Sequence, residues 1–298
     1  MYDHILLAVD GSDEAKQAAK RGLEFARDFD ATVDVLHVVE KKALRLTKTA
    51  DEADRLRERG ETILEDIQSI ASDVGHSVTM ELTEGEPARR IAEYAADRGA
   101  TLIVVGRQGV TSLGKRLLGG VTEGLLRRSD VPVLVVPEED RTTGEAFDYS
   151  RLLLPTDGSE NADTAIDHGV AVARQYGSII HVLNVIDLQA SGGVFDVGGL
   201  EKELVERLEA NGAAIVDEVA AEIDDVASDV TVETAVERTT SFDGVAAGIS
   251  EYVTDNDIDL IAMGARGRSN LGRHLLGSVA SNVLRTVDVP VLIVTRSP

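Results

Sequence analysis

The segment at 264–278 combines glycines, a hydroxyl and positive charge in a spacing that suits phosphate. Gly264 and Gly267 follow an apolar run, and nine residues separate Gly267 from Gly277-Ser278. Glycines at a strand end let the backbone approach a phosphate, and free N–H groups at a helix start hold an anion. Positive charge gathers in the same segment, on Arg266, Arg268, Arg273 and His274. A loop that needed glycine only for turning would leave this charge unexplained, so the sequence favours a phosphate site.

Two aspartates follow apolar runs in matching contexts. Asp10 and Asp157 each begin the triplet Asp-Gly-Ser. A carboxylate at a strand end can accept a hydrogen bond from a ligand hydroxyl. The alternative is a simple turn in which Ser12 and Ser159 cap the helices that follow.

Other catalytic patterns are missing from the sequence. The six histidines include no pair at metal-ligand spacing, and the chain has no cysteine, which excludes disulfides and thiolate metal sites. There is no Gly-x-x-x-x-Gly-Lys-Ser/Thr loop, Gly-x-Ser-x-Gly elbow or Gly-x-Gly-x-x-Gly after the first strand. The sequence therefore predicts no catalytic residue and no metal held by protein side chains.

The chain is an internal duplication. The segment YDHILLAVDGSDEA from Tyr2 aligns with YSRLLLPTDGSENA from Tyr149 at an offset of 147 residues. Further on, LIVVGRQG from Leu102 aligns with LIAMGARG from Leu260 at an offset of 158. We therefore expect two homologous domains, 1–138 and 149–298, joined by a polar linker at 139–148.

Each copy alternates short apolar runs with longer amphipathic stretches. In the first copy, runs rich in Val, Ile and Leu occupy 5–9, 33–39, 102–105 and 133–136, and 78–82 alternates as a fifth strand would. Between these runs, apolar residues recur at the spacing of an amphipathic helix. This order predicts an α/β fold with two tandem doubly wound parallel sheets, whose ligands bind beyond the carboxyl ends of the strands.

The charge balance excludes some partners and indicates an environment. With 53 acidic and 30 basic residues, the net charge is −23, which argues against binding to nucleic acid or to anionic membranes. Arginines outnumber lysines by 23 to 7, and an acidic, lysine-poor chain is typical of a halophile. The N-terminus lacks the basic region of a signal peptide, and no run is long enough to span a membrane. We expect a cytoplasmic location.

The combined motifs resemble the universal stress protein (UspA) family. Gly-x2-Gly-x9-Gly-Ser/Thr, PTDGSENA on the first strand and DVPVLIV on the last carry this resemblance, which covers nearly the whole chain once per copy. It implies five parallel strands in the order 3-2-1-4-5, flanked by helices, and an ATP site whose Mg²⁺ arrives with the phosphates. In the second copy the implied ATP-binding residues are Pro155, Thr156, Asp157, Val185, Met263, Gly264, Arg266, Gly267, Arg268, Gly277, Ser278 and Val279.

The first copy departs from the pattern at its phosphate end. Gly120 replaces the hydroxyl residue, and Gln108 and Val110 stand where the second copy has arginines, although Lys115 and Arg116 restore some charge. The corresponding, weaker set is Ala8, Val9, Asp10, Val38, Val105, Gly106, Gln108, Gly109, Gly119, Gly120, Val121 and Thr122. The second copy in turn lacks the Gly-x-Pro found at 85–87. We expect the second copy to bind ATP well, and the first to bind it weakly or to bind another nucleotide.

Three functions are compatible with these features. The first is an ATP-binding stress-response or signalling protein without fast catalysis. The second is a slow ATPase or nucleotidyl-transfer enzyme, since the fold is shared with nucleotide α-hydrolases. The third is a structural dimerisation module with a vestigial site. In each case the resemblance implies that the two copies pair as an intramolecular pseudo-dimer through their last strands, 131–136 and 289–294, with a further homodimer as an open alternative.

Overall fold

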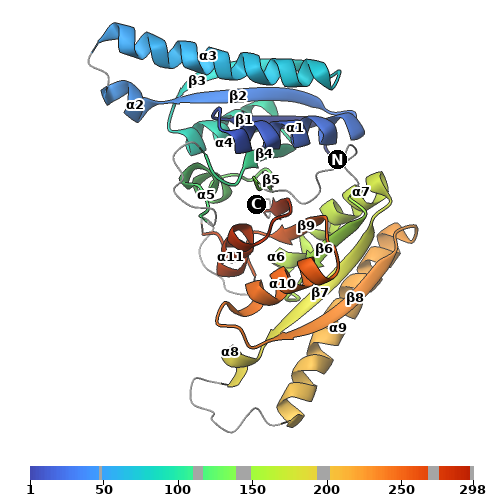
Figure 1. The fold of residues 1–298 in the computed structure, drawn as a ribbon. Coiled ribbons are helices and arrows are strands. Elements are labelled where there is room, and N and C mark those ends of the chain that lie inside the picture. Colours follow the sequence, from blue (N-terminus) through green and yellow to red (C-terminus); the bar gives the residue numbers. More distant parts are fainter. Residues whose placement is uncertain (47–48, 110–116, 139–148, 193–201, 268–274, 296–298) are drawn as a thin grey trace. The chain divides into compact units, whose positions relative to one another are not determined.

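The computed structural model describes residues 1–46, 49–109, 117–138, 149–192, 202–267 and 275–295, and divides near residue 140 into two compact units (Figure 1). We call the part before residue 140 unit 1 and the part after it unit 2. The linker expected at 139–148 lies outside the described residues.

Unit 1 is built on a parallel sheet whose strands run in the order β3-β2-β1-β4-β5. Leu7 at its centre is aligned with Val35 and Val104, and all three side chains are buried. Strands buried in this way are covered by helices on both faces. The strands are β1 (His4–Val9), β2 (Thr32–Glu40), β3 (Val78–Gly85), β4 (Leu102–Gly106) and β5 (Val133–Val136).

The helices of unit 1 begin and end at local signals in the sequence. Ser12 caps the first helix, because its Oγ accepts a hydrogen bond from the N–H of Ala15 at 3.1 Å. A later helix begins at Pro87 and ends at Arg98, and its C-cap, Gly99, has a φ of 68° in the left-handed region that favours glycine. The helices are α1 (Asp13–Asp28), α2 (Lys41–Leu46), α3 (Ala50–Asp73), α4 (Pro87–Arg98) and α5 (Gly120–Leu126).

Unit 2 repeats this sheet in the order β8-β7-β6-β9-β10, which confirms the tandem α/β prediction and the 3-2-1-4-5 order in each copy. Its strands are β6 (Arg151–Pro155), β7 (Ile179–Asp187), β8 (Val232–Thr239), β9 (Leu260–Gly264) and β10 (Val291–Val294). Its helices are α6 (Glu160–Asp163), α7 (Ile166–Tyr176), α8 (Leu188–Gly192), α9 (Lys202–Ala227), α10 (Gly244–Asp255) and α11 (Ser278–Thr286).

One local difference separates the copies. The long α1 of unit 1 corresponds to two pieces in unit 2, α6 and α7. At the break, the hydroxyl of Thr164 donates to the carbonyl oxygen of Asn161 at 2.7 Å. A threonine that hydrogen-bonds a nearby carbonyl competes with the helical pattern, which fits an interruption here.

Within the described residues, no helix combines the length and the apolar character needed to cross a membrane.

Candidate functional site

A cavity of about 650 Å³ lies at the carboxyl end of the unit 2 sheet. Its lining residues come from the ends of β6, β7 and β9 and from α6, α8, α10 and α11. The structure brings together eleven of the twelve residues predicted for this copy, and Arg268 lies outside the described residues. Those lining the cavity are Pro155, Thr156, Asp157, Val185, Met263, Gly264, Arg266, Gly267, Gly277, Ser278 and Val279.

The turn after β6 holds Asp157 in the wall of this cavity. Its Oδ1 accepts a hydrogen bond from the N–H of Ser159 at 3.1 Å. Ser159 in turn caps α6, with its Oγ accepting from the N–H of Ala162 at 3.4 Å, so the turn and the cap predicted from Asp-Gly-Ser are both present. A Cβ at Gly267 would lie only 2.4 Å from Asp157 Oδ2. Glycine at 267 therefore lets the backbone approach the carboxylate.

The glycine motif closes a loop in the cavity wall. The N–H of Gly277 donates to the carbonyl oxygen of Ala265 at 2.9 Å, and Arg266 Nε donates to the carbonyl oxygen of Leu275 at 3.1 Å. These bonds join the two ends of the segment that contains 268–274. Gly277 precedes α11 without a side-chain cap, so the first N–H groups of this helix lie at the cavity wall beside Ser278.

The cavity lining also includes apolar residues that the sequence did not predict. Val245 and Ile249 lie four residues apart on α10 and line the cavity together with the predicted Val185 and Met263. Their helical spacing was a usable signal, but nothing in the sequence says that α10 covers the end of β7. The missed lining residues are Ala162, Leu183, Asn184, Ala190, Val245, Ile249 and Ala280. Asn184 also fixes the strand end, since its Nδ2 donates to the carbonyl oxygen of Thr156 at 2.8 Å.

Unit 1 has a corresponding but smaller cavity of about 400 Å³. It brings together all twelve predicted residues: Ala8, Val9, Asp10, Val38, Val105, Gly106, Gln108, Gly109, Gly119, Gly120, Val121 and Thr122. Asp10 occupies the position of Asp157, with Oδ1 accepting from the Ser12 hydroxyl at 2.6 Å. A Cβ at Gly109 would lie 2.3 Å from Asp10 Oδ2. The missed lining residues are Ala15, Leu36, Glu40, Pro87 and Ile91.

The two cavities differ where the glycine motif lines them. The helix at this end begins with Gly120 in unit 1 and with Ser278 in unit 2. Unit 1 has a hydroxyl two residues later, on Thr122, but this Oγ1 donates to the carbonyl oxygen of Gly106 at 2.9 Å. Val110, Lys115 and Arg116, which entered the comparison of charge, lie outside the described residues. Among the residues described, unit 2 thus offers one hydroxyl and one arginine that unit 1 lacks at these positions.

Metal-ligating side chains do not gather at either site. Within the part of the chain that the structure describes, no group of three or more His, Cys, Asp or Glu residues is placed to hold a metal ion.

Known proteins resemble this chain along its whole length. The model of the universal stress protein family matches residues 1–137 and again 148–295. A universal stress protein of Mycolicibacterium smegmatis is 29% identical over 302 residues, covering 97% of this chain and 96% of that protein. Universal stress protein MJ0531 of Methanocaldococcus jannaschii is 34% identical over 140 residues, covering 46% of this chain and 82% of that protein. A universal stress protein structure from Archaeoglobus fulgidus superposes with a TM-score of 0.71 at 22% identity, covering 100% of this chain and 97% of that one.

Proposed function

The chain belongs to the universal stress protein family, and from that premise we propose that it is an ATP-binding stress-response protein without fast catalysis. Two copies of the family's domain, 1–138 and 149–298 with a linker at 139–148, supply one site each. Unit 2 is the principal ATP site. Unit 1 binds ATP more weakly or binds a different nucleotide.

The observation that carries this proposal is the combination of chemistries that lines the unit 2 cavity. Val185, Val245 and Met263 supply apolar side chains that suit a purine base. Asp157 supplies a carboxylate that can accept hydrogen bonds from ribose hydroxyls. The glycine loop and the first turn of α11, with Ser278, present donors to phosphates. One cavity thus offers a partner for each of the three parts of a nucleoside triphosphate.

The proposal assigns Mg²⁺ to the nucleotide rather than to the protein. Mg²⁺ usually keeps several water ligands and is bound through substrate phosphates. Asp157 is the only carboxylate among the described residues that line the unit 2 cavity, and its Oδ1 is already engaged by Ser159. The phosphates would therefore carry the ion into the site.

An enzymatic alternative requires a general base close to the phosphates. The described lining of the unit 2 cavity contains no histidine, and the candidate His274 lies outside the described residues. The proposal assigns Asp157 to the ribose hydroxyls. A binding role is therefore the better-supported function, and slow ATP hydrolysis remains the alternative to test.

Assembly and location complete the proposal. We propose that the two copies form an intramolecular pseudo-dimer through 131–136 and 289–294, and that the protein works in a salt-rich cytoplasm. With a net charge of −23, self-repulsion weakens the folded state at low ionic strength, so the melting temperature should rise from millimolar to molar KCl.

Two measurements on the purified chain test the function. Mass spectrometry of ligand released on denaturation should identify an adenine nucleotide, and calorimetric titration should show ATP binding in the presence of Mg²⁺. Single-turnover incubation with ATP should yield no fast release of phosphate. Failure of ATP to bind either unit would refute the proposed function, whereas rapid turnover would replace it with the ATPase alternative.

A further inference from the structure

The side chain of Glu14 is buried directly behind the glycine loop of unit 1. Glu14 is the second residue of α1 and is 7% exposed. A Cβ at Gly106 would lie 3.2 Å from its Cγ, and the backbone N–H groups of Arg107 and Gln108 donate hydrogen bonds to its carboxylate. Its Oε1 has no hydrogen-bond partner among the described residues. The carboxylate therefore touches the same backbone segment that forms the phosphate end of the cavity.

Two charged side chains face this carboxylate from neighbouring segments. Arg107, after β4, favours its ionised form, and Glu138, after β5, opposes it. Burial outweighs the hydrogen bonds and the attraction to Arg107, and raises the pKa of Glu14 to about 7. Glu14 can therefore gain or lose its charge near neutral pH.

Unit 2 has no acid at the equivalent position. The sequence offset of 147 residues places Asn161 where unit 1 has Glu14, and the offset of 158 places Ala265 where unit 1 has Arg107. Asn161 Nδ2 donates to the carbonyl oxygen of Gly267 at 3.4 Å, so a neutral amide supports the loop there. The charged pair of unit 1 has been exchanged as a set for neutral residues.

We propose that Glu14 couples the binding of nucleotide phosphates in the unit 1 cavity to the uptake of a proton, a coupling that unit 2 lacks. The inference rests on the proposed function, because it concerns the same nucleotide site. When ionised, Glu14 places a negative charge behind the loop and repels phosphate. When protonated, it removes that repulsion. Unit 1 should therefore bind nucleotide phosphates more tightly as the pH falls from 8 to 6.

Single-tryptophan reporters can follow each unit separately, because the chain contains no tryptophan. Glu86→Trp places a reporter beside Pro87 at the unit 1 cavity, and Phe242→Trp places one near Val245 at the unit 2 cavity. Glu86 is not among the described residues that line the unit 1 cavity, and Phe242 is not among those that line the unit 2 cavity. Titrations with ATP and Mg²⁺ at pH 6, 7 and 8 then give a dissociation constant for each unit, while calorimetry on the unsubstituted chain counts the sites.

The ratio of the two dissociation constants is the decisive quantity, since protonation of ATP itself affects both units. If bound phosphate raises the proton affinity of Glu14 about tenfold, the dissociation constant of unit 1 divided by that of unit 2 should rise about fivefold from pH 6 to pH 8. Calorimetry in two buffers of different ionisation enthalpy should show uptake of about half a proton per nucleotide by unit 1 near pH 7.5. Adenosine, which carries no phosphate, should show neither effect.

Matched variants separate the charge from the packing. Glu14→Gln keeps an acceptor for the backbone N–H groups, and should raise unit 1 affinity at pH 8 while leaving it nearly unchanged at pH 6. Asn161→Glu with Ala265→Arg should introduce the pH dependence into unit 2. The reverse outcomes would overturn the coupling: a ratio independent of pH, a Glu14→Gln chain with the parent's pH profile, or no binding of millimolar ATP by unit 1 at pH 6. Binding of ATP by unit 2 would leave the proposed function standing in each of these cases.

Discussion

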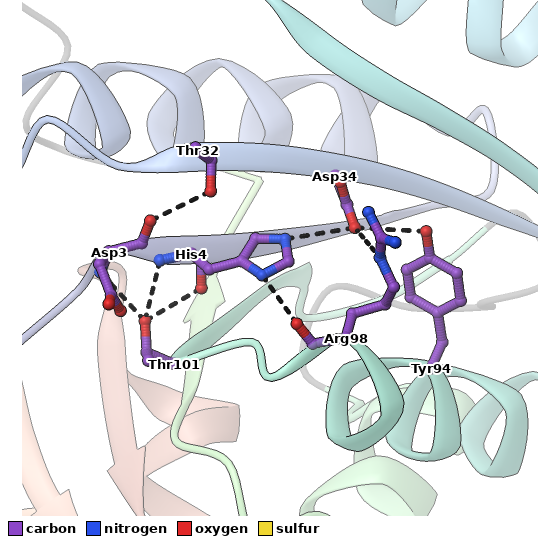
Figure 2. Close-up of polar contacts among 7 residues, drawn as sticks. All are labelled: Asp3, His4, Thr32, Asp34, Tyr94, Arg98 and Thr101. Atoms are coloured by element: carbon purple, nitrogen blue, oxygen red, sulfur yellow. Dashed lines mark hydrogen bonds and ion pairs between the residues drawn. The ribbon is translucent and has the colours of Figure 1, made fainter.

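The two copies of the domain differ clearly at the end of each sheet where the strands begin. In unit 1, the buried Asp34 on β2 accepts hydrogen bonds from Arg98 Nε at 2.9 Å and from the Tyr94 hydroxyl at 3.3 Å, and lies 3.2 Å from His4 Nε2 (Figure 2). The cluster joins β1, β2 and the end of α4. Figure 2 also shows Thr101 contacting the backbone of the first strand.

At the equivalent end of its sheet, unit 2 has a buried base where unit 1 has a buried acid. The repeat offsets place His181 where unit 1 has Asp34, with Arg151 at the position of His4 and Tyr252 at that of Tyr94. His181 Nδ1 lies 3.0 Å from the Tyr252 hydroxyl and 3.8 Å from Glu233 Oε2. The tyrosine is kept, while the acid has become a base and its partners have changed with it.

This difference teaches that a buried polar group depends on the partners around it. A buried acid requires donors around it, and a buried base requires acceptors, because an unpaired buried polar group is costly. Where the acid of unit 1 is replaced by a base in unit 2, the charged neighbours differ too, although the tyrosine is common to both. Glu14 with Arg107 in unit 1 and Asn161 with Ala265 in unit 2 are a second case in which two neighbouring residues differ together.

The largest expected effect comes from making unit 2 resemble unit 1 at its phosphate end. Ser278→Gly with Arg268→Val should weaken ATP binding by unit 2 by about 2–4 kcal/mol, because a hydroxyl donor and a charge-assisted contact are lost. Calorimetry should show the tight site of the parent chain reduced toward the weaker one. Equal affinities at both sites of the parent chain, or a tight site that survives this double change together with Asp157→Ala, would contradict the comparison.

A second pair of variants tests the close approach of loop and carboxylate in both units. Gly267→Ala places a Cβ 2.4 Å from Asp157 Oδ2, and Gly109→Ala places one 2.3 Å from Asp10 Oδ2. Each carboxylate must then move, so each variant should lower nucleotide affinity in its own unit by about 1 kcal/mol, the scale of one hydrogen bond. The tryptophan reporters would assign the losses, and an effect in the other unit would argue against separate sites.

A gain of function in unit 1 should be smaller. A Cβ at Gly120 meets no atom within 4 Å, so Gly120→Ser can add a hydroxyl without strain. Affinity for ATP should improve by less than about 1 kcal/mol, because one neutral hydrogen bond is restored. Titration of this variant beside the parent gives the measurement. An improvement that brought unit 1 level with unit 2 would mean that the arginines of unit 2 contribute little.

The smallest effect concerns how His181 and Asp34 make the free energy of unfolding depend on pH. Burial lowers the pKa of His181 below its ordinary value, so the unfolded chain takes up a proton first and this contribution to stability falls as the pH drops below about 6.5. Burial alone would raise the pKa of Asp34, but the hydrogen bond from Arg98 and the charges of His4 and Arg98 lower it. The contribution of ionised Asp34 to the stability of the fold is therefore lost only as the pH falls below about 4.

Urea unfolding of variants at several pH values separates these contributions. His181→Gln should flatten the loss of stability between pH 7 and pH 5 relative to the parent chain. Asp34→Asn should lower the free energy of unfolding by a constant amount over that range, and the difference from the parent should shrink below pH 4. Parallel pH profiles for His181→Gln and the parent chain would show that His181 does not titrate on unfolding in this range.

The sequence by itself determined the α/β fold of each copy and the central residues of each candidate site. The repeat, the apolar runs and the Gly-x2-Gly-x9-Gly spacing predicted two parallel sheets and placed Asp10, Asp157 and the glycines at their carboxyl ends. These features are encoded locally, in strand periodicity, turn residues and caps, so they can be recognised without knowing what packs against them. The assignment of these residues to a nucleotide remains a prediction.

Only the tertiary structure decided what covers these centres. The strand expected at 78–82 continues to Gly85, because β2 pairs with it as far as Glu40. Pro87 and Ile91 of α4 reach the unit 1 cavity, as Val245 and Ile249 of α10 reach that of unit 2. Glu14 meets the backbone of Arg107 and Gln108 more than ninety residues away. Contacts between such distant segments depend on how the helices pack on the sheet, which no local pattern encodes.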